Sequence, residues 1–344
     1  MKLLTFLSVL AICFSSTALA IELNRSNQSG IAEAYGFVVG QQMTLDRIAN
    51  RYPDLAREAF LAGLSFERTF GDVRARVEPI FKQALGQEMF EKFQSDLKRE
   101  LQGQSRRVEL TRTTAEAFLE EVHSRSEGNI YSPALEFLLA IRFEKYPVDE
   151  FIEGFRKRYR TDGIGKSLGV VLNMQLPQSW KGMEGNRPHI VRKWKSEAGT
   201  GNELIMLQVR ETGVMNVSRA DVAELMQPDE VMSLLPDGSE LEEYGLVSVE
   251  NMPGYFVDFS HLNERAGMAI YQKIRQYSIY YRDKLILVQC SAGALERDYE
   301  AVESSFESVK PVCTQVFNSL VLPEEYKNSE PELQHEDGGY MPSI

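Results

Sequence analysis

The feature that most constrains the fold of this chain is a change of hydrophobic period near residue 163. Before it, apolar residues recur at the 3.6-residue spacing of amphipathic helices, and after it they alternate with a period of two. Gly163 and Gly165 stand at the change, and glycines so placed favour a linker. We therefore predict an all-α N-terminal domain over residues 21–162 and an α/β domain over residues 165–322.

The N-terminal pattern predicts helices from Ile31 to about Tyr159, the last of them beginning at Pro147. Gly36 and Gly40 lie four residues apart on the first helix, which would let a partner helix approach closely. Farther along, one apolar stripe recurs every four residues: Leu85, Met89, Phe93, Leu97 and Leu101. The pattern favours helix packing for this stripe, and the alternative is an exposed arm that dimerises or binds clients.

The C-terminal pattern predicts a mainly antiparallel sheet with helices packed on it. Strands are expected at residues 168–176, 190–195, 203–209, 246–250, 254–259, 269–281 and 285–290, with a helix at 220–235. The last strand is apolar on both faces, which is typical of a central strand covered on both sides. A final helix carries the clearest stripe in the chain, namely Leu295, Tyr299, Val302, Phe306 and Val309.

Residues 1–20 have the order of a secretory signal peptide: an early lysine, an apolar run, and small residues ending at Ala18 and Ala20. We expect cleavage before Ile21 and a secreted, periplasmic mature protein. Cys13 raises a lipoprotein alternative, but it lies inside the apolar run, which disfavours lipidation. No later stretch is long and apolar enough for a membrane span, so we expect the mature chain to be soluble.

Charge and cysteine content narrow the function further. The net charge of −12 argues against nucleic acid, because phosphate binding needs a basic surface. Residues 323–344 carry six acids against one lysine, together with prolines and glycines, and we predict a disordered acidic tail. Cys290 and Cys313 remain after cleavage. An oxidising compartment permits a disulfide between them, and two separate buried thiols are the alternative.

Two local motifs resemble known families. The segment Leu172-Asn173-Met174-Gln175-Leu176-Pro177-Gln178-Ser179-Trp180 and the Ser305-Phe306 pair of the last helix resemble PsbP-like domains over about residues 165–322. This resemblance implies action by protein binding and brings no catalytic residue. More faintly, residues 31–102, with Ala34-Tyr35-Gly36, Gly40 and the segment 58–64, are similar to the helical dimerisation segment of exported FKBP-type prolyl isomerases. That similarity implies dimerisation or client handling, because no isomerase domain follows.

The sequence contains no complete catalytic motif. The segment 163–167 (Gly-Ile-Gly-Lys-Ser) looks like the end of a phosphate-binding loop, but Arg160 replaces the required glycine and a strand follows. The four histidines, His123, His189, His261 and His335, lack metal-ligand spacing to one another or to cysteine. No Gly-x-Ser-x-Gly motif marks a nucleophile. We therefore predict no catalytic, cofactor-binding or metal-ligating residues, and the sequence favours a protein that is not an enzyme.

The binding candidates come from the C-terminal half. Tyr271, Tyr277 and Tyr281 share a strand face with Lys273 and Arg275, and tyrosine and arginine are enriched at interfaces. Ordinary sheet composition is the alternative explanation.

Trp180, Arg187 and His189 could frame a second site near the first hairpin, although Trp180 is better explained as a core anchor. We predict an exported, non-enzymatic protein-binding or assembly factor with a protein partner and a homodimer through the helical domain. The rivals are an exported hydrolase with a site from scattered residues, and a periplasmic chaperone that uses the helical domain.

Overall fold

The computed structural model describes residues 26–265 and 267–326, so the predicted signal peptide and cleavage site, Cys13, His335 and residues 327–344 lie outside the described residues.

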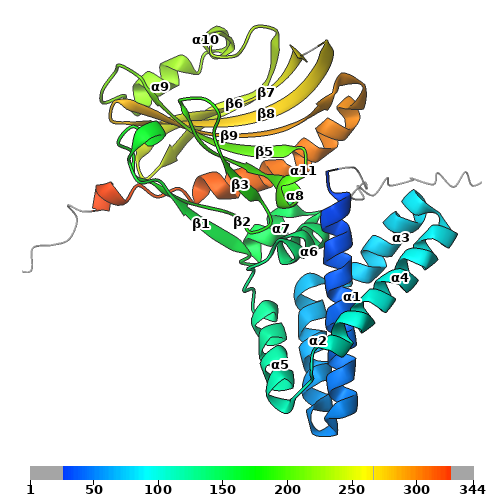
Figure 1. Cartoon of the computed structure of the whole chain (residues 1–344). Coiled ribbons are helices and arrows are strands. Elements are labelled where there is room, and N and C mark those ends of the chain that lie inside the picture. The colour runs from blue at the N-terminus through cyan, green and yellow to red at the C-terminus, as the bar shows by residue number, and fades with distance from the viewer. Residues whose placement is uncertain (1–25, 266, 327–344) are drawn as a thin grey trace, which may run out of the picture.

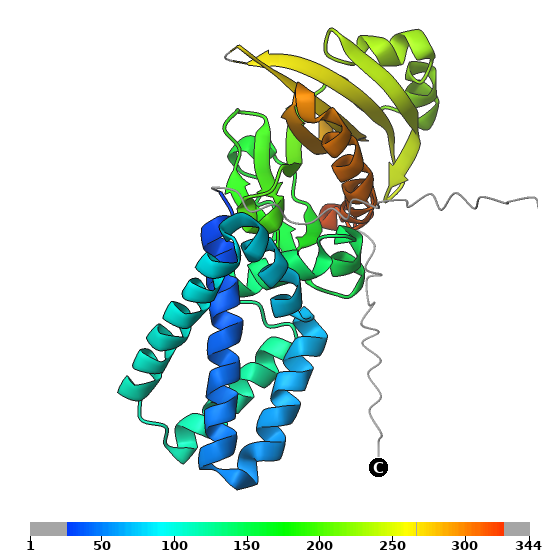
Figure 2. The same ribbon diagram turned by 90° about the vertical axis from the view of Figure 1, so that its right-hand side faces the viewer.

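The N-terminal part is helical, as predicted. Its helices are α1 (Gln28–Arg51), α2 (Ala56–Phe70), α3 (Val73–Leu85), α4 (Gln87–Arg107), α5 (Arg112–Ser126), α6 (Pro133–Phe143) and α7 (Pro147–Ile152), with a 3-10 turn η1 at Pro53–Leu55. Figures 1 and 2 show α1, α2, α4 and α5 extending away from the sheet, whereas α6 and α7 lie beside it.

Local chemistry explains where these helices begin and end. Asp72, Thr111 and Ser132 each accept a hydrogen bond from a backbone N–H in the first turn of α3, α5 and α6, which satisfies a donor that has no partner inside the helix. Gly86 has φ 79°, a left-handed conformation that glycine adopts readily, and it separates α3 from α4. Gly86 thus ends α3, while Pro79 stays inside it.

The helices share one apolar core. An aromatic cluster joins α1 to the α3–α4 pair, with ring centroids 5.7 Å apart for Tyr35 and Phe81 and 5.3 Å apart for Phe81 and Phe93. The fully buried side chains of α6, including Leu135, Leu138 and Leu139, fill the end of the core that faces the sheet. We refer to α1–α6 as the helical bundle.

The C-terminal part contains two antiparallel sheets. A small one pairs β1 (Arg156–Arg160) with β2 (Asn173–Pro177). The large one has seven strands in the order β3-β4-β5-β9-β8-β7-β6. Its strands are β3 (Lys181–Glu184), β4 (Ile190–Lys195), β5 (Glu203–Glu211), β6 (Ser239–Val249), β7 (Met252–Arg265), β8 (Met268–Tyr281) and β9 (Lys284–Leu295). The predicted fold class is confirmed, and the strand that is apolar on both faces, β9, is the central one.

Helices cover both faces of the large sheet (Figure 1). On one face, α11 (Tyr299–Asn318) packs against β5, β8 and β9, and a disulfide between Cys290 and Cys313 joins it to β9. On the other face, α9 (Arg219–Leu225) and α10 (Pro228–Ser233) bury Val222 and Val231 against β7 and β8. Of the two alternatives for the cysteines, the structure has the disulfide. Within the described ranges, no helix combines the length and apolarity that crossing a membrane requires.

Several predicted boundaries are wrong for identifiable reasons. The helix from Pro147 ends at Ile152, and residues 156–160 form β1, because Gly154 adopts a positive φ of 96° that interrupts the helix. The strand predicted from Leu168 begins only at Asn173, since Leu168 has φ 47°. The single helix predicted at 220–235 is two, with Pro228 opening the second.

Strands β6 and β7 are also much longer than the predicted 246–250 and 254–259 segments, and in β6 the exposed Glu240, Glu242 and Glu243 hide the alternation. Pro323–Tyr326, at the start of the tail predicted to be disordered, form a 3-10 turn, η4. There Arg282 pairs with Glu324 and Glu325.

The predicted domain boundary lies in the loop between the two strands of the small sheet. Thus β1, on its N-terminal side, pairs with β2, on its C-terminal side. Helix α7 likewise contributes Phe151 to the core beneath the sheet. The bundle and the sheet therefore meet along α6 and α7, and this contact is called the seam below.

Candidate functional site

A groove in the helical bundle is the leading candidate for a binding site. It lies between α1, α4 and α5 and has a volume of about 570 Å³. Its walls are largely apolar and include Phe37, Met43, Leu101, Val108, Leu110 and Phe118. Apolar concavities of this size are the usual form of sites for small molecules or for anchoring side chains of a protein partner.

The two glycines on α1 form part of the groove wall where α4 approaches. A Cβ placed on Gly40 would lie 3.3 Å from Leu101 Cδ2, and one on Gly36 would lie 3.5 Å from Leu97 Cδ1. The sequence therefore correctly indicated a close helix approach at these positions. The partner helix is α4, from the same chain.

The far end of α4 is held to α1 by hydrogen bonds to its backbone. The guanidinium of Arg47 donates to the Ser105 carbonyl oxygen at 2.7 Å and to the Val108 carbonyl oxygen at 3.3 Å. The Tyr52 hydroxyl donates to the Leu110 carbonyl oxygen at 3.0 Å. These bonds fix the loop that forms one end of the groove, while Val108 itself is 63% exposed.

A buried cation lies at the other end of the groove. The Arg125 guanidinium is 4.9 Å from the centre of the Phe37 ring, and it donates at 2.8 Å to both Gln41 Oε1 and the Tyr131 hydroxyl. It also pairs with Glu121 on the preceding turn of α5. Because the charge of Arg125 is paired and its donors are used, this residue orders the groove wall.

The predicted apolar stripe divides between core and solvent and also between two helices, because Leu85 is the last residue of α3 and the other four residues lie on α4. Phe93, Leu97 and Leu101 pack against the bundle core, whereas Leu85 is 41% exposed and Met89 is 55% exposed. Helix packing explains the first three positions. The remaining two add apolar surface outside the groove.

The predicted adhesive patch on the sheet is wrong for Arg275, Tyr277 and Tyr281, because all three are buried beneath α11. The ring of Tyr277 stacks on that of Phe317 with centroids 4.1 Å apart. Burial raises the pKa of Tyr281 to about 12. Sheet composition, the alternative explanation, is the correct one for these residues.

Buried charges under α11 are paired with one another. Arg275 donates to both carboxylate oxygens of Asp258, at 2.6 and 2.7 Å, and Lys310 reaches Asp258 at 2.9 Å. Lys273 pairs with Glu242 at 2.8 Å and with Glu303 at 2.7 Å. Burial alone would lower the pKa of Lys273, but its two carboxylate partners raise it overall. This network helps to fix α11 and β6 on the sheet.

The structure does not bring Trp180, Arg187 and His189 together. Trp180 is buried next to β3, where Lys181 is opposite Lys195, whereas Arg187 and His189 lie at the far tip of the β3–β4 hairpin. Burial lowers the pKa of His189, and the charges of Arg210 and Arg187 lower it further. Trp180 is the core anchor that the sequence suggested.

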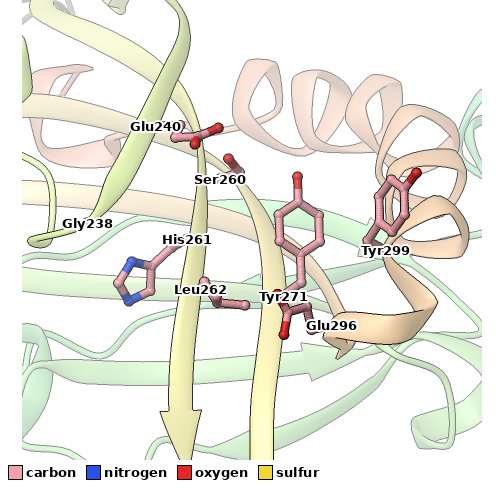
Figure 3. A pocket seen from close by; sticks show the side chains of 8 residues that line it. All are labelled: Gly238, Glu240, Ser260, His261, Leu262, Tyr271, Glu296 and Tyr299. Atoms are coloured by element: carbon pink, nitrogen blue, oxygen red, sulfur yellow. The ribbon is translucent and has the colours of Figure 1, made fainter.

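Tyr271, a predicted candidate, lines an open pocket at the end of the sheet beside the start of α11 (Figure 3). The pocket has a volume of about 290 Å³. Tyr271 and Tyr299 stand nearly perpendicular, with ring centroids 6.5 Å apart, and the Tyr271 hydroxyl donates to Glu303 at 2.6 Å. Figure 3 shows Ser260 and Glu240 on the same side as Tyr271, while His261 points to the other side.

A serine–histidine contact lies beside this pocket. Ser239 Oγ is 3.2 Å from His261 Nδ1, across the β6–β7 ladder. No carboxylate within residues 26–265 and 267–326 forms an ion pair with His261, so the acid of a catalytic triad is not found there. Sequence reasoning missed this pair because its members are 22 residues apart and joined only by strand register.

Comparisons with known proteins concern the fold. No family model matches the chain, and no curated protein shows significant similarity to it. Similar solved structures include a cyanobacterial PsbP from Synechocystis, with 15% identity over 48% of this chain and 92% of that chain and a TM-score of 0.31. They also include the Saccharomyces cerevisiae Ran-binding protein Mog1p, with 9% identity over 48% of this chain and 95% of that chain and a TM-score of 0.34.

A third similar structure is LpqN of Mycobacterium tuberculosis, which is involved in cell envelope biogenesis. Its identity is 12% over 49% of this chain and 95% of that chain, and its TM-score is 0.30. PsbP is thus among the similar structures, as the sequence resemblance predicted. At these identities and scores the likeness supports no argument about ligand or partner. The resemblance to an isomerase dimerisation segment stays a prediction.

Proposed function

We propose that this protein is an exported binding or assembly factor that holds an apolar segment of a partner protein in the groove between α1, α4 and α5. The observation that carries the proposal is the groove itself, with its apolar walls and a volume of about 570 Å³. Export rests on the predicted signal peptide. A homodimer through the bundle remains a prediction.

The expected free energy of binding indicates a transient interaction. Burying one large apolar side chain contributes about 1.5–3 kcal/mol. Two or three such anchors would give a gross gain of roughly 3–9 kcal/mol, and association costs at least about 4 kcal/mol in lost freedom. At most about 5 kcal/mol then remains, which corresponds to a dissociation constant of roughly 0.2 mM or weaker. Such a protein would bind and release its partners readily.

The test uses a fluorescently labelled model protein that is kept unfolded by reduction and alkylation, with binding measured by anisotropy. Val108→Glu places a charge in the groove at an exposed residue, so folding should be unaffected. We expect it to weaken binding by about tenfold or more, since a desolvated charge opposes burial. The matched control is Val214→Glu, because Val214 is 57% exposed and outside the groove, against 63% for Val108. Equal affinity of the two variants would contradict the proposal.

The contact between Ser239 and His261 supports a second candidate, the exported hydrolase. If that function is correct, a serine-directed fluorophosphonate should label Ser239, and Ser239→Ala should abolish both labelling and ester hydrolysis. If the binding function is correct, the wild-type protein should remain unlabelled. The two candidates therefore differ in a single assay.

A further inference from the structure

The segment between β4 and β5, residues 196–201, contains the short turn α8 (Ser196–Gly199; Figure 1) and joins the sheet to the helical bundle. Ala198 is buried in the bundle core, and its N–H donates to the Ser179 carbonyl oxygen at 2.9 Å. Ser26, just before α1, donates from its hydroxyl to the Thr200 carbonyl oxygen at 3.5 Å. The loop thus contacts both sides of the seam, and we call residues 196–201 the latch loop.

The latch loop has a strained backbone. Glu197 has φ 50° and ψ 53°, and Ala198 has φ 52° and ψ 25°. Left-handed conformations cost a residue with a Cβ about 1–2 kcal/mol each. Two such residues in succession persist only where the surrounding structure holds them in place. The loop is therefore poised to relax if its contacts weaken.

Acidic side chains surround a small cavity at the seam, with a volume of about 70 Å³. Glu150 of α7 is 1% exposed and accepts hydrogen bonds from the Ser179 N–H at 2.6 Å and the Ser179 hydroxyl at 2.7 Å. Glu203 of β5 accepts from the hydroxyls of Ser196 and Ser305. Glu144 and Glu197 complete the acidic lining.

In the part of the chain that the structure describes, the nearby basic groups form no ion pair with Glu150, Glu197 or Glu203. Lys157 of β1 acts on Glu150 only through its charge, and Lys195 of β4 acts on Glu197 in the same way. From α11, the groups that reach the cavity are Ser308 and Val309, which carry no charge.

Burial raises the pKa of Glu150 to about 7, even though Ser179 and Lys157 oppose the shift. The pKa of Glu197 is also raised to about 7, first by burial and then by the charge of Glu203, against a hydrogen bond with Asn27 and the charge of Lys195. Both carboxyls ordinarily have a pKa of 4.5. Each therefore takes up a proton more readily in the folded protein than in the unfolded chain.

We propose that the latch loop is an acid-tightened joint, in which protonation of Glu197 and Glu150 holds the helical bundle on the sheet and their ionisation loosens it. The sign follows from linkage: a raised acid pKa stabilises the folded state below about pH 4.5, and this stabilisation is lost as pH rises through about 7. Above neutral pH, charge repulsion between Glu197 and Glu203 adds to the backbone strain. The loop then opens more often, and the seam loosens first around residues 196–201.

Hydrogen exchange of the full chain tests this proposal at about pH 5.5 and about pH 8, after correction for the intrinsic pH dependence of exchange. In the wild type, amides of residues 196–201 should exchange about tenfold or more faster at the higher pH, since each unit of pKa shift is a factor of ten. Glu197→Gln mimics the protonated side chain and should reduce this difference markedly. Glu240→Gln, at an exposed residue of β6, should retain it.

A second measurement needs no variant that could fail to fold. In wild-type protein labelled with ¹³C at the glutamate carboxyl carbons, at least one resonance should titrate near pH 7. The proposal is overturned if every glutamate resonance titrates below about pH 5.5. It is also overturned if exchange at residues 196–201 shows no pH dependence, or if Glu197→Gln keeps the full wild-type pH response.

Discussion

Two helices of similar length, α4 in the bundle and α11 on the sheet, are held in very different ways. Helix α4 has 21 residues, of which only Phe90 is buried. Helix α11 has 20 residues and buries seven of them: Val302, Phe306, Val309, Val312, Cys313, Val316 and Phe317. In the sequence both helices carry a clear apolar stripe, so the stripe alone does not distinguish a core helix from one that borders a groove.

The difference shows where each region can interact. The face of α11 is committed to the sheet by its apolar residues, the disulfide to β9 and the buried ion pairs of Lys273 and Lys310. The inner face of α4 is only half covered, and Leu101 lines the groove while resting over Gly40. Binding by rearrangement of apolar side chains is therefore expected in the bundle and not beneath α11.

The largest expected effect is a loss of stability where α11 packs on the sheet. Phe306 is 1% exposed between α11 and the sheet. Phe306→Ala should lower the free energy of unfolding by about 3–5 kcal/mol, because apolar contact is lost and a cavity remains. Urea denaturation measures this loss.

The control for that substitution is Glu307→Ala, at an exposed position on α11 with a change expected below about 0.5 kcal/mol. Glu303, although it is acidic and outside the apolar stripe, is not a neutral position, since it pairs with Lys273 and Tyr271. If Phe306→Ala left stability unchanged and instead removed partner binding, the contrast between the two helices would be reversed.

A smaller loss of stability is expected where α4 borders the groove. Leu101→Ala should cost about 1 kcal/mol or less in global stability, because the side chain is only half buried. Hydrogen exchange in residues 97–107 should nevertheless become faster than in the wild type, since Leu101 holds α4 over Gly40. A loss as large as that of Phe306→Ala would show that α4 belongs to the rigid core.

The sequence predicted the fold well where periodicity reports burial. The helical N-terminal part, the central strand β9 and the packing stripe of α11 all follow from apolar spacing, which burial dictates directly. The predicted stripe was wrong at its start, because Leu295 is the last residue of β9 and Tyr299, the first residue of α11, is 51% exposed and faces the sheet-end pocket. The two-stranded sheet of β1 and β2 was missed because β1 is rich in arginine and lysine.

The candidate sites were harder to predict. Alternation shows that Arg275, Tyr277 and Tyr281 share one face of β8, but it cannot show that α11 covers that face. The strained pair at Glu197 and Ala198 has no signal in the sequence, since neither residue is glycine. For the groove, the glycines at positions 36 and 40 indicated a close helix approach in the sequence. The remaining walls depend on how α4 and α5 pack in the folded protein.

The most direct test of the binding function is hydrogen exchange of the full chain with and without the unfolded model protein. The account predicts slower exchange in α1 residues 33–47 and in residues 101–110 when the model protein is bound, because these segments line the groove. Strands β8 and β9 should be unchanged. Protection confined to the sheet, or no protection of the groove segments at saturating model protein, would contradict the account.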